Sequence, residues 1–87
     1  MHNGSLVYSN TAVASTDGVV STGRHTSSIK FLNTHATTNA VVRVNGGPQS
    51  VLIPAIASGG GYVELLGDYT SFEVVTASVT LAVIAFG

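Results

Sequence analysis

Apolar and polar side chains alternate along most of the chain with a period of two residues. From Thr26 onward, short runs rich in valine, isoleucine and threonine are separated by groups of glycine, asparagine, aspartate and serine. This pattern is typical of short antiparallel strands in a sandwich or a barrel. No segment carries a sustained helical repeat of apolar positions. The sequence therefore predicts an all-β domain, a small antiparallel β-sandwich or barrel of about six to eight short strands.

Turn residues set the expected ends of the strands. Asn45-Gly46 is the strongest turn signal, because Asn-Gly accepts the positive φ angles of a tight hairpin. Pro54 cannot donate to a strand ladder, which predicts an edge strand or a bulge at that point. A final hairpin is predicted about Thr76–Ser78. From Thr26 onward the predicted strands are Thr26–Asn33, Ala40–Asn45, Val51–Ile56, Tyr62–Leu66, Ser71–Thr76 and Val79–Phe86. Leu6–Ala14 and Val19–Thr22 are candidate edge strands.

The polarity of the chain changes near residue 28. Nine of the first 28 residues are apolar, against thirty of the remaining 59. We therefore predict two regions, a polar N-terminal arm or edge strands over 1–28 and a compact β domain over 29–87. Two interpretations of 1–28 remain open. The segment forms one or two edge strands, or it is an extended arm that becomes ordered against a neighbour.

The last predicted strand is apolar on both of its faces. The outer face of a surface strand is normally polar, because it meets water. Here the alternation places Ile84 and Phe86 opposite the core, so we expect either the N-terminal region or another chain to cover them. We expect Phe72 in the core. The last strand's core face holds Val79, Leu81, Val83 and Ala85, and its other face holds Thr80, Ala82, Ile84 and Phe86.

Composition supports association with other chains. Charged residues make up 8% of the 87 residues, against about 25% in ordinary soluble domains. The chain has no cysteine, so no disulfide adds to the small core of so short a domain. We therefore expect a homo-oligomer. The net charge of −1 gives no electrostatic footprint for nucleic acid or for an anionic membrane, so neither is an expected partner.

The polar residues form no recognisable reactive site. The three histidines follow no zinc-ligand spacing, and the acidic residues of Glu64–Glu73 match no calcium loop. No serine lies in a nucleophile-elbow motif, and Ser58–Gly61 lacks the lysine of a phosphate loop. We therefore expect neither enzymatic activity nor a metal or cofactor.

Two sets of exposed side chains are candidates for binding. Lys30 and Arg43 are predicted on the outward faces of adjacent strands, where they either meet acidic groups of a partner or keep that face wet. Tyr62, Tyr69 and Asp68 are predicted near one turn. Exposed aromatic rings stack on sugars, so this second set defines a glycan-binding alternative. Packing in a core or an interface is the more common role of such rings.

Two segments resemble parts of small virion proteins of tailed phages. They are Asn33–Gly47, a polar turn before a valine-rich strand, and Thr70–Gly87, which ends flush with its last strand. The resemblance implies a capsid decoration (cement) protein that binds and stabilises the capsid, or a small tail or head-fibre component. It further implies a trimer that contacts the major capsid protein or other virion proteins, located in the virion after assembly in the host cytoplasm. A glycan-binding, host-recognising fibre component is the alternative.

Overall fold

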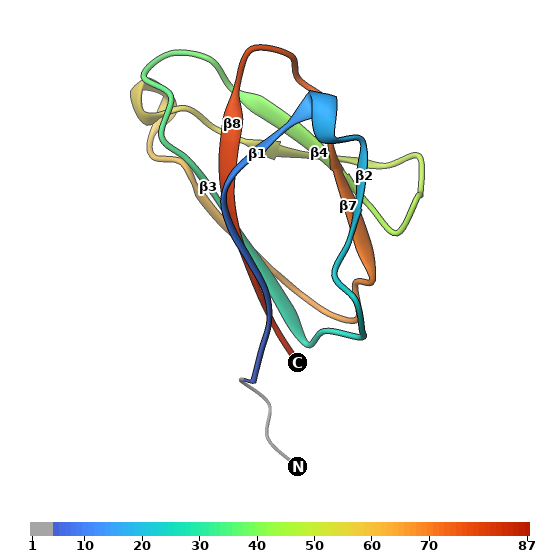
Figure 1. Cartoon of the computed structure of the whole chain (residues 1–87). Helices are drawn as coiled ribbons and strands as arrows, with labels where there is room; N and C mark the ends of the chain where they lie inside the picture. The colour runs from blue at the N-terminus through green and yellow to red at the C-terminus, as the bar shows by residue number, and fades with distance from the viewer. Residues whose placement is uncertain (1–4) are drawn as a thin grey trace.

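The computed structural model describes residues 5–87 and shows two antiparallel sheets packed face to face (Figure 1). Each sheet has four strands, and two short 3₁₀ turns, η1 (Ser15–Asp17) and η2 (Ile56–Ser58), lie in the connections. The predicted all-β class and the sandwich architecture are confirmed. The strands are β1 (Leu6–Ala14), β2 (Val19–Ser21), β3 (Ser28–Asn33), β4 (Ala40–Val44), β5 (Ser50–Ile53), β6 (Tyr62–Leu66), β7 (Ser71–Val74) and β8 (Thr80–Phe86).

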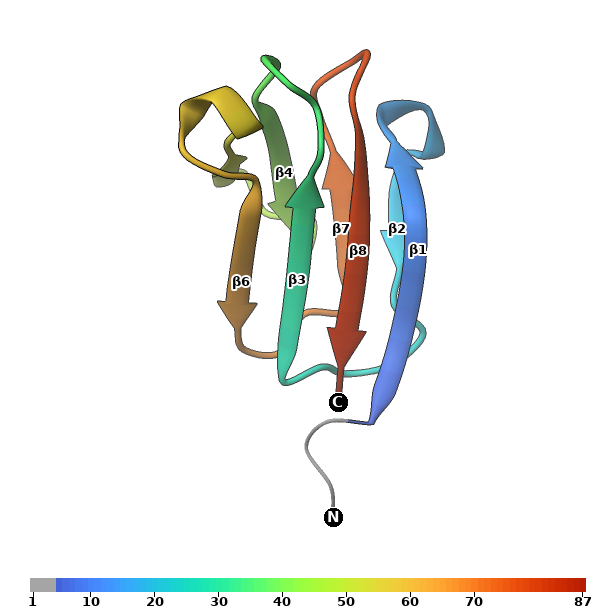
Figure 2. The same cartoon turned by 90° about the vertical axis from the view of Figure 1, so that its left-hand side faces the viewer.

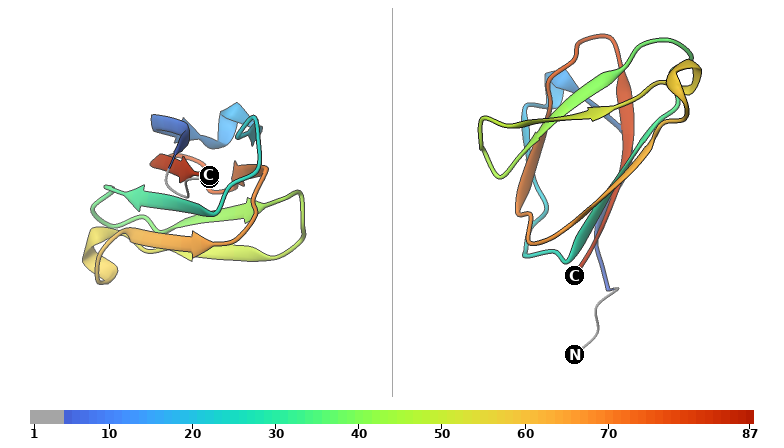
Figure 3. Two further views of the ribbon diagram at one scale, coloured as in Figure 1. Left: turned by 90° about the horizontal axis from the view of Figure 1, so that it is seen from below. Right: turned by 180° about the vertical axis from the view of Figure 1, so that it is seen from behind.

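The strand order shows that the chain passes repeatedly between the sheets. Sheet A has the order β1-β8-β3-β6 and faces the viewer in Figure 2, while sheet B has the order β2-β7-β4-β5 and lies behind it. Among the described strands, only the β4–β5 connection joins two neighbours within one sheet. That hairpin projects from the side of the sandwich (Figure 3). Asn45 and Gly46 have φ angles of 56° and 65°, so the predicted Asn-Gly turn is confirmed.

The predicted hairpin about Thr76–Ser78 is wrong. β7 pairs with β2 and β4 in sheet B, whereas β8 pairs with β1 and β3 in sheet A. Phe72 and Leu81 are both buried, and they approach the core from opposite sheets. Alternation shows which side chains of a strand face the core, but it does not distinguish two neighbours in one sheet from two strands in facing sheets.

The core lies between the two sheets and is built from the inward side chains of both. The Phe72 ring makes edge contacts with Phe31 and Tyr8, with ring centroids 5.7 and 5.6 Å apart. Such edge-to-face pairs add to the stabilisation from burial alone. The predicted core residues Phe72, Leu81 and Val83 are confirmed. The buried apolar cluster comprises Val13, Ile29, Phe31, Ala40, Val42, Ile53, Phe72, Val74, Val79, Leu81, Val83 and Ala85.

Of the four buried polar side chains in the described residues, one is fully enclosed beside this core. Asn33, at the end of β3, is 0% exposed. Its Nδ2 donates to the carbonyl oxygens of Thr38 and Ile53 at 2.9 and 3.1 Å, and its Oδ1 accepts from the His35 N–H at 2.9 Å. Asn33 therefore ties the end of sheet A to β5 of sheet B and shapes the β3–β4 connection.

The N-terminal region forms edge strands in the described part of the chain. β1 pairs with β8 at one edge of sheet A, and β2 pairs with β7 at one edge of sheet B. The change in polarity near residue 28 coincides with the start of β3, and strands from both sides of it share the same sheets. Within residues 6–21 the structure therefore shows edge strands and not an extended arm. His2 lies outside the described residues.

Candidate interaction surface

The outer surface of sheet A carries several large apolar side chains that are exposed to solvent. Because alternate side chains of a strand share one face, the strand register defines three cross-strand rows on this surface. The first row joins Tyr62, Leu32 and Ala82; the second joins Glu64, Lys30, Ile84 and Ser9; the third joins Leu66, Ser28, Phe86 and Leu6. The name sheet A face is used below for these side chains.

The sheet A face is largely apolar and open to solvent. Leu66, Tyr62, Leu6 and Leu32 are 76%, 57%, 55% and 41% exposed, while Ile84 is half-buried. The outward side of an antiparallel sheet normally carries polar side chains. Contiguous apolar surface on a small protein marks a site of interaction. The face therefore has the character of a surface that other molecules cover.

Two covers were expected for Ile84 and Phe86, the N-terminal region or another chain, and the structure excludes the described N-terminal strand. β1 lies beside β8 in the plane of sheet A and does not cross its outer surface (Figure 2). Among residues 5–87, no strand packs over this surface, because sheet B lies on the opposite side. The described N-terminal strand therefore does not cover these side chains.

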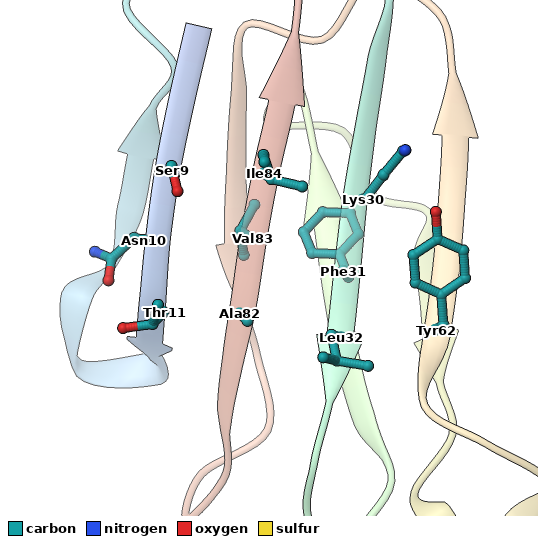
Figure 4. A pocket seen from close by; sticks show the side chains of 10 residues that line it. All are labelled: Ser9, Asn10, Thr11, Lys30, Phe31, Leu32, Tyr62, Ala82, Val83 and Ile84. Carbon is teal, nitrogen blue, oxygen red and sulfur yellow. The ribbon is translucent and has the colours of Figure 1, made fainter. Parts of the chain in front are cut away.

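A shallow groove crosses the sheet A face. It has a volume of about 280 Å³ and runs from Ser9–Thr11 of β1, over Ala82, to Leu32 and Tyr62 (Figure 4). The small side chain of Ala82 lowers the surface beside Leu32, its cross-strand neighbour. Figure 4 shows the Asn10 amide and the Thr11 hydroxyl directed away from Ala82, so the surface of the groove is mostly carbon. This shape and chemistry suit an apolar side chain of another molecule.

The charges on the sheet A face balance. Lys30 and Glu64 lie directly opposite each other on β3 and β6. The Lys30 Nζ atom also lies 5.3 Å from the centroid of the Phe86 ring, within cation–π range. Lys30 thus lies outward, as alternation predicts. Its two neighbours Glu64 and Phe86 belong to the same face. The net charge of the face is thus close to zero, but among the described residues no ion pair joins Lys30 to Glu64, and the Glu64 carboxylate stays exposed on the edge strand.

The expectation that Lys30 and Arg43 lie on adjacent strands is wrong. Lys30 is on β3 in sheet A, and Arg43 is on β4 in sheet B. The connection between these strands crosses the sandwich, so the two cations point away from opposite sides of it. Arg43 is paired across strands with Glu73 of β7. A single flat partner therefore does not contact both Lys30 and Arg43.

The outer surface of sheet B is also partly apolar. Val19 and Leu52 are 64% and 54% exposed on its edge strands, and Val75, just after β7, is 39% exposed. The Arg43–Glu73 pair balances its charge, as Lys30 and Glu64 do on the other side. Both sides of the sandwich therefore offer neutral, carbon-rich surface.

The three residues of the glycan-binding alternative do not converge. Tyr62 begins β6 and lies on the sheet A face, while Tyr69 and Asp68 follow the opposite end of that strand. The half-buried Tyr69 ring packs over Gly67. The Asp68 carboxylate accepts a hydrogen bond from Nδ1 of His25 at 2.7 Å. No platform of two rings and a carboxylate forms.

Other polar groups give no reactive site in the part of the chain described. Among residues 5–87, no three His, Asp or Glu side chains come close enough together to hold a metal ion. The His25–Asp68 pair is the closest approach of such groups, and both side chains are well exposed, at 81% and 60%. In the same residues, no helix has the length and hydropathy needed to cross a bilayer.

Comparison with known proteins adds no relative. No protein-family model, curated protein or solved structure matches the chain. The resemblance to phage virion proteins therefore stays a prediction, and the functional argument depends on the surfaces of the molecule itself.

Ile84, Phe86 and Lys30 are members of the face that the sequence pattern predicted to lie outward, and Tyr62 was expected in the glycan-binding set instead. Leu32, Leu66 and Tyr62 complete it from β3 and β6. Alternation within Tyr62–Leu66 places Tyr62 and Leu66 on the side away from Val63 and Leu65. The order β8-β3-β6, which brings these sides together, has no local signal in the sequence.

Proposed function

We propose that this protein is a non-enzymatic structural protein that assembles with other protein chains through the sheet A face. One observation carries the proposal. Four large apolar side chains on this face, Leu6, Leu32, Tyr62 and Leu66, are each more than 40% exposed and are continuous with Ile84 and Phe86 through the strand register. Burying such surface is the main favourable term in protein association.

The specific form that we propose is a homo-oligomeric decoration module of a phage capsid, most simply a trimer. In this role the protein contacts the major capsid protein or other virion proteins and is located in the virion after assembly in the host cytoplasm. Two features support it beside the resemblance of Asn33–Gly47 and Thr70–Gly87. The sandwich is small and free of cysteine, and both of its outer surfaces are neutral and apolar enough to contact neighbours.

Association would stabilise the fold by mass action, because a partner that binds only the native state raises its apparent stability. Light scattering over a dilution series, combined with thermal unfolding at each concentration, tests this. We expect an oligomer at micromolar concentration and a melting temperature that rises with concentration. A stable monomer with a constant melting temperature contradicts self-association, and absence of the chain from purified virions contradicts the capsid role.

A further inference from the structure

The outer edge of β6 carries unused backbone hydrogen-bonding groups. Gly67 donates its N–H to the Ser27 carbonyl at 2.9 Å, and the Asn33 N–H donates to the Gly61 carbonyl. These bonds bracket the β3–β6 ladder and fix its alternation, so the odd-numbered residues of β6 bond to β3. The backbone groups of Tyr62, Glu64 and Leu66 therefore point away from the sheet. The Tyr69 hydroxyl approaches the Leu66 carbonyl at 3.5 Å, which is the limit of a hydrogen bond.

The other three strand edges are blunted in ways that β6 is not. β1 is interrupted by two register shifts, β2 is three residues long, and β5 is followed by Pro54. Bulges, short strands and proline are the usual protections against unwanted strand pairing. β6 pairs with β3 over five consecutive residues without a bulge. Within the described chain it is the longest regular, open edge, since β5 pairs over four residues.

Glu64 restricts what can pair with this edge. If β6 paired antiparallel with β6 of a second copy over its full length, Glu64 would lie directly opposite its own counterpart, and like charges at that spacing are destabilising. A shift of the register by two residues leaves only three residues of each strand paired. The strand is thus protected against its own copy while its backbone edge stays open.

We propose that the β6 edge binds an extended segment of another protein by strand addition, with a lysine or arginine of that segment opposite Glu64. Antiparallel addition exchanges two hydrogen bonds between Glu64 and the basic residue. In the added segment, the residues two positions before and after the basic residue lie next to Tyr62 and Leu66, which are 57% and 76% exposed. We expect apolar side chains at these two positions of the segment. The segment that the β6 edge recognises therefore has five residues in the order apolar, any residue, basic, any residue, apolar. This site is separate from contacts made by Phe86.

A peptide titration tests the site. The probe is a blocked peptide with lysine at its centre, valine two residues to either side and threonine at the four remaining positions; its partner has glutamate at the centre. Each is titrated into the ¹⁵N-labelled full-length protein. We expect shifts concentrated at the amides of Tyr62, Glu64 and Leu66, and binding of the lysine peptide on the order of fivefold tighter than that of the glutamate peptide.

Charge reversal provides the sharpest control. Glu64→Lys should invert the peptide preference, whereas Glu73→Lys, which changes an outward carboxylate on sheet B, should leave it unchanged. Phe86→Asp disrupts the sheet A face two strands away and should retain peptide binding, so failure of this site is distinguished from failure of the proposed assembly.

Three results would overturn the proposal. The first is no saturable shift at the β6 amides up to millimolar peptide. The second is equal binding of both peptides, or a preference that Glu64→Lys does not invert. The third is slow hydrogen exchange at the Tyr62, Glu64 and Leu66 amides before peptide is added, because that would show the edge already paired.

Discussion

The Nζ atom of Lys30 lies 5.3 Å from the centroid of the Phe86 ring. Lys30 belongs to β3 and Phe86 to the neighbouring strand β8. The contact lies within the sheet A face, where Glu64 faces Lys30 from the other side. Lys30 therefore has its charge engaged by its own chain, and the surrounding apolar surface is left for a partner.

Phe86→Asp should abolish or strongly weaken assembly. A carboxylate there would have to be desolvated when the sheet A face is covered, so we expect association at least about tenfold weaker. Far-UV circular dichroism should stay unchanged, because Phe86 faces away from the core, and light scattering measures the association. Thr80→Asp places the same charge at the exposed start of β8 and is the matched control. Wild-type assembly by the Phe86 variant would exclude this residue from the interface.

Lys30→Met should lower the free energy of unfolding by no more than about 1 kcal/mol. The substitution keeps an unbranched side chain over the sheet but removes the cation–π contact with Phe86 and the charge opposite Glu64, and both are weak at a solvent-accessible site. Urea denaturation measures the change, and Lys30→Arg should recover most of it. A loss of several kcal/mol would mean that the ammonium group is buried by an assembly.

Gly61→Ala should destabilise the fold by roughly 1–3 kcal/mol, which is typical of overpacking. A Cβ atom at this position would overlap the Asn33 carbonyl oxygen, where the start of β6 passes close to the end of β3. Gly47→Ala is the control, because its Cβ atom would lie at an ordinary 3.5 Å from the nearest backbone oxygen. Thermal and urea unfolding should separate the two variants, and equal stability would show that the close approach relaxes freely.

Asn33→Ala should cost roughly 2–4 kcal/mol of stability. The change removes three hydrogen bonds and leaves the Ile53 carbonyl without this partner inside the core. Asn39→Ala removes a single bond, to the Ala55 N–H, at an exposed residue and should cost no more than about 1 kcal/mol. If the two variants unfold at the same urea concentration, the Asn33 network is not an anchor between the sheets.

The pattern of the sequence located most strands within a few residues and assigned their faces correctly. Phe72 and Leu81 were placed in the core, and Ile84 and Phe86 opposite it, because the direction of a side chain in a strand depends only on alternation. The Asn45-Gly46 turn was likewise local, since it depends on the φ angles of its own residues.

Apart from the β4–β5 hairpin, the tertiary structure alone decided which strands are neighbours. Pairing β8 with β1 brings the first and last strands together, and placing β3 between β8 and β6 puts Leu32 between Tyr62 and Ala82. The same order separates Lys30 from Arg43. Strand partners distant in the sequence are chosen by the joint packing of both sheets, so no local pattern encodes them. The sequence by itself determined that the last strand has an apolar outer face, and the sheet order made that strand the middle of a continuous surface.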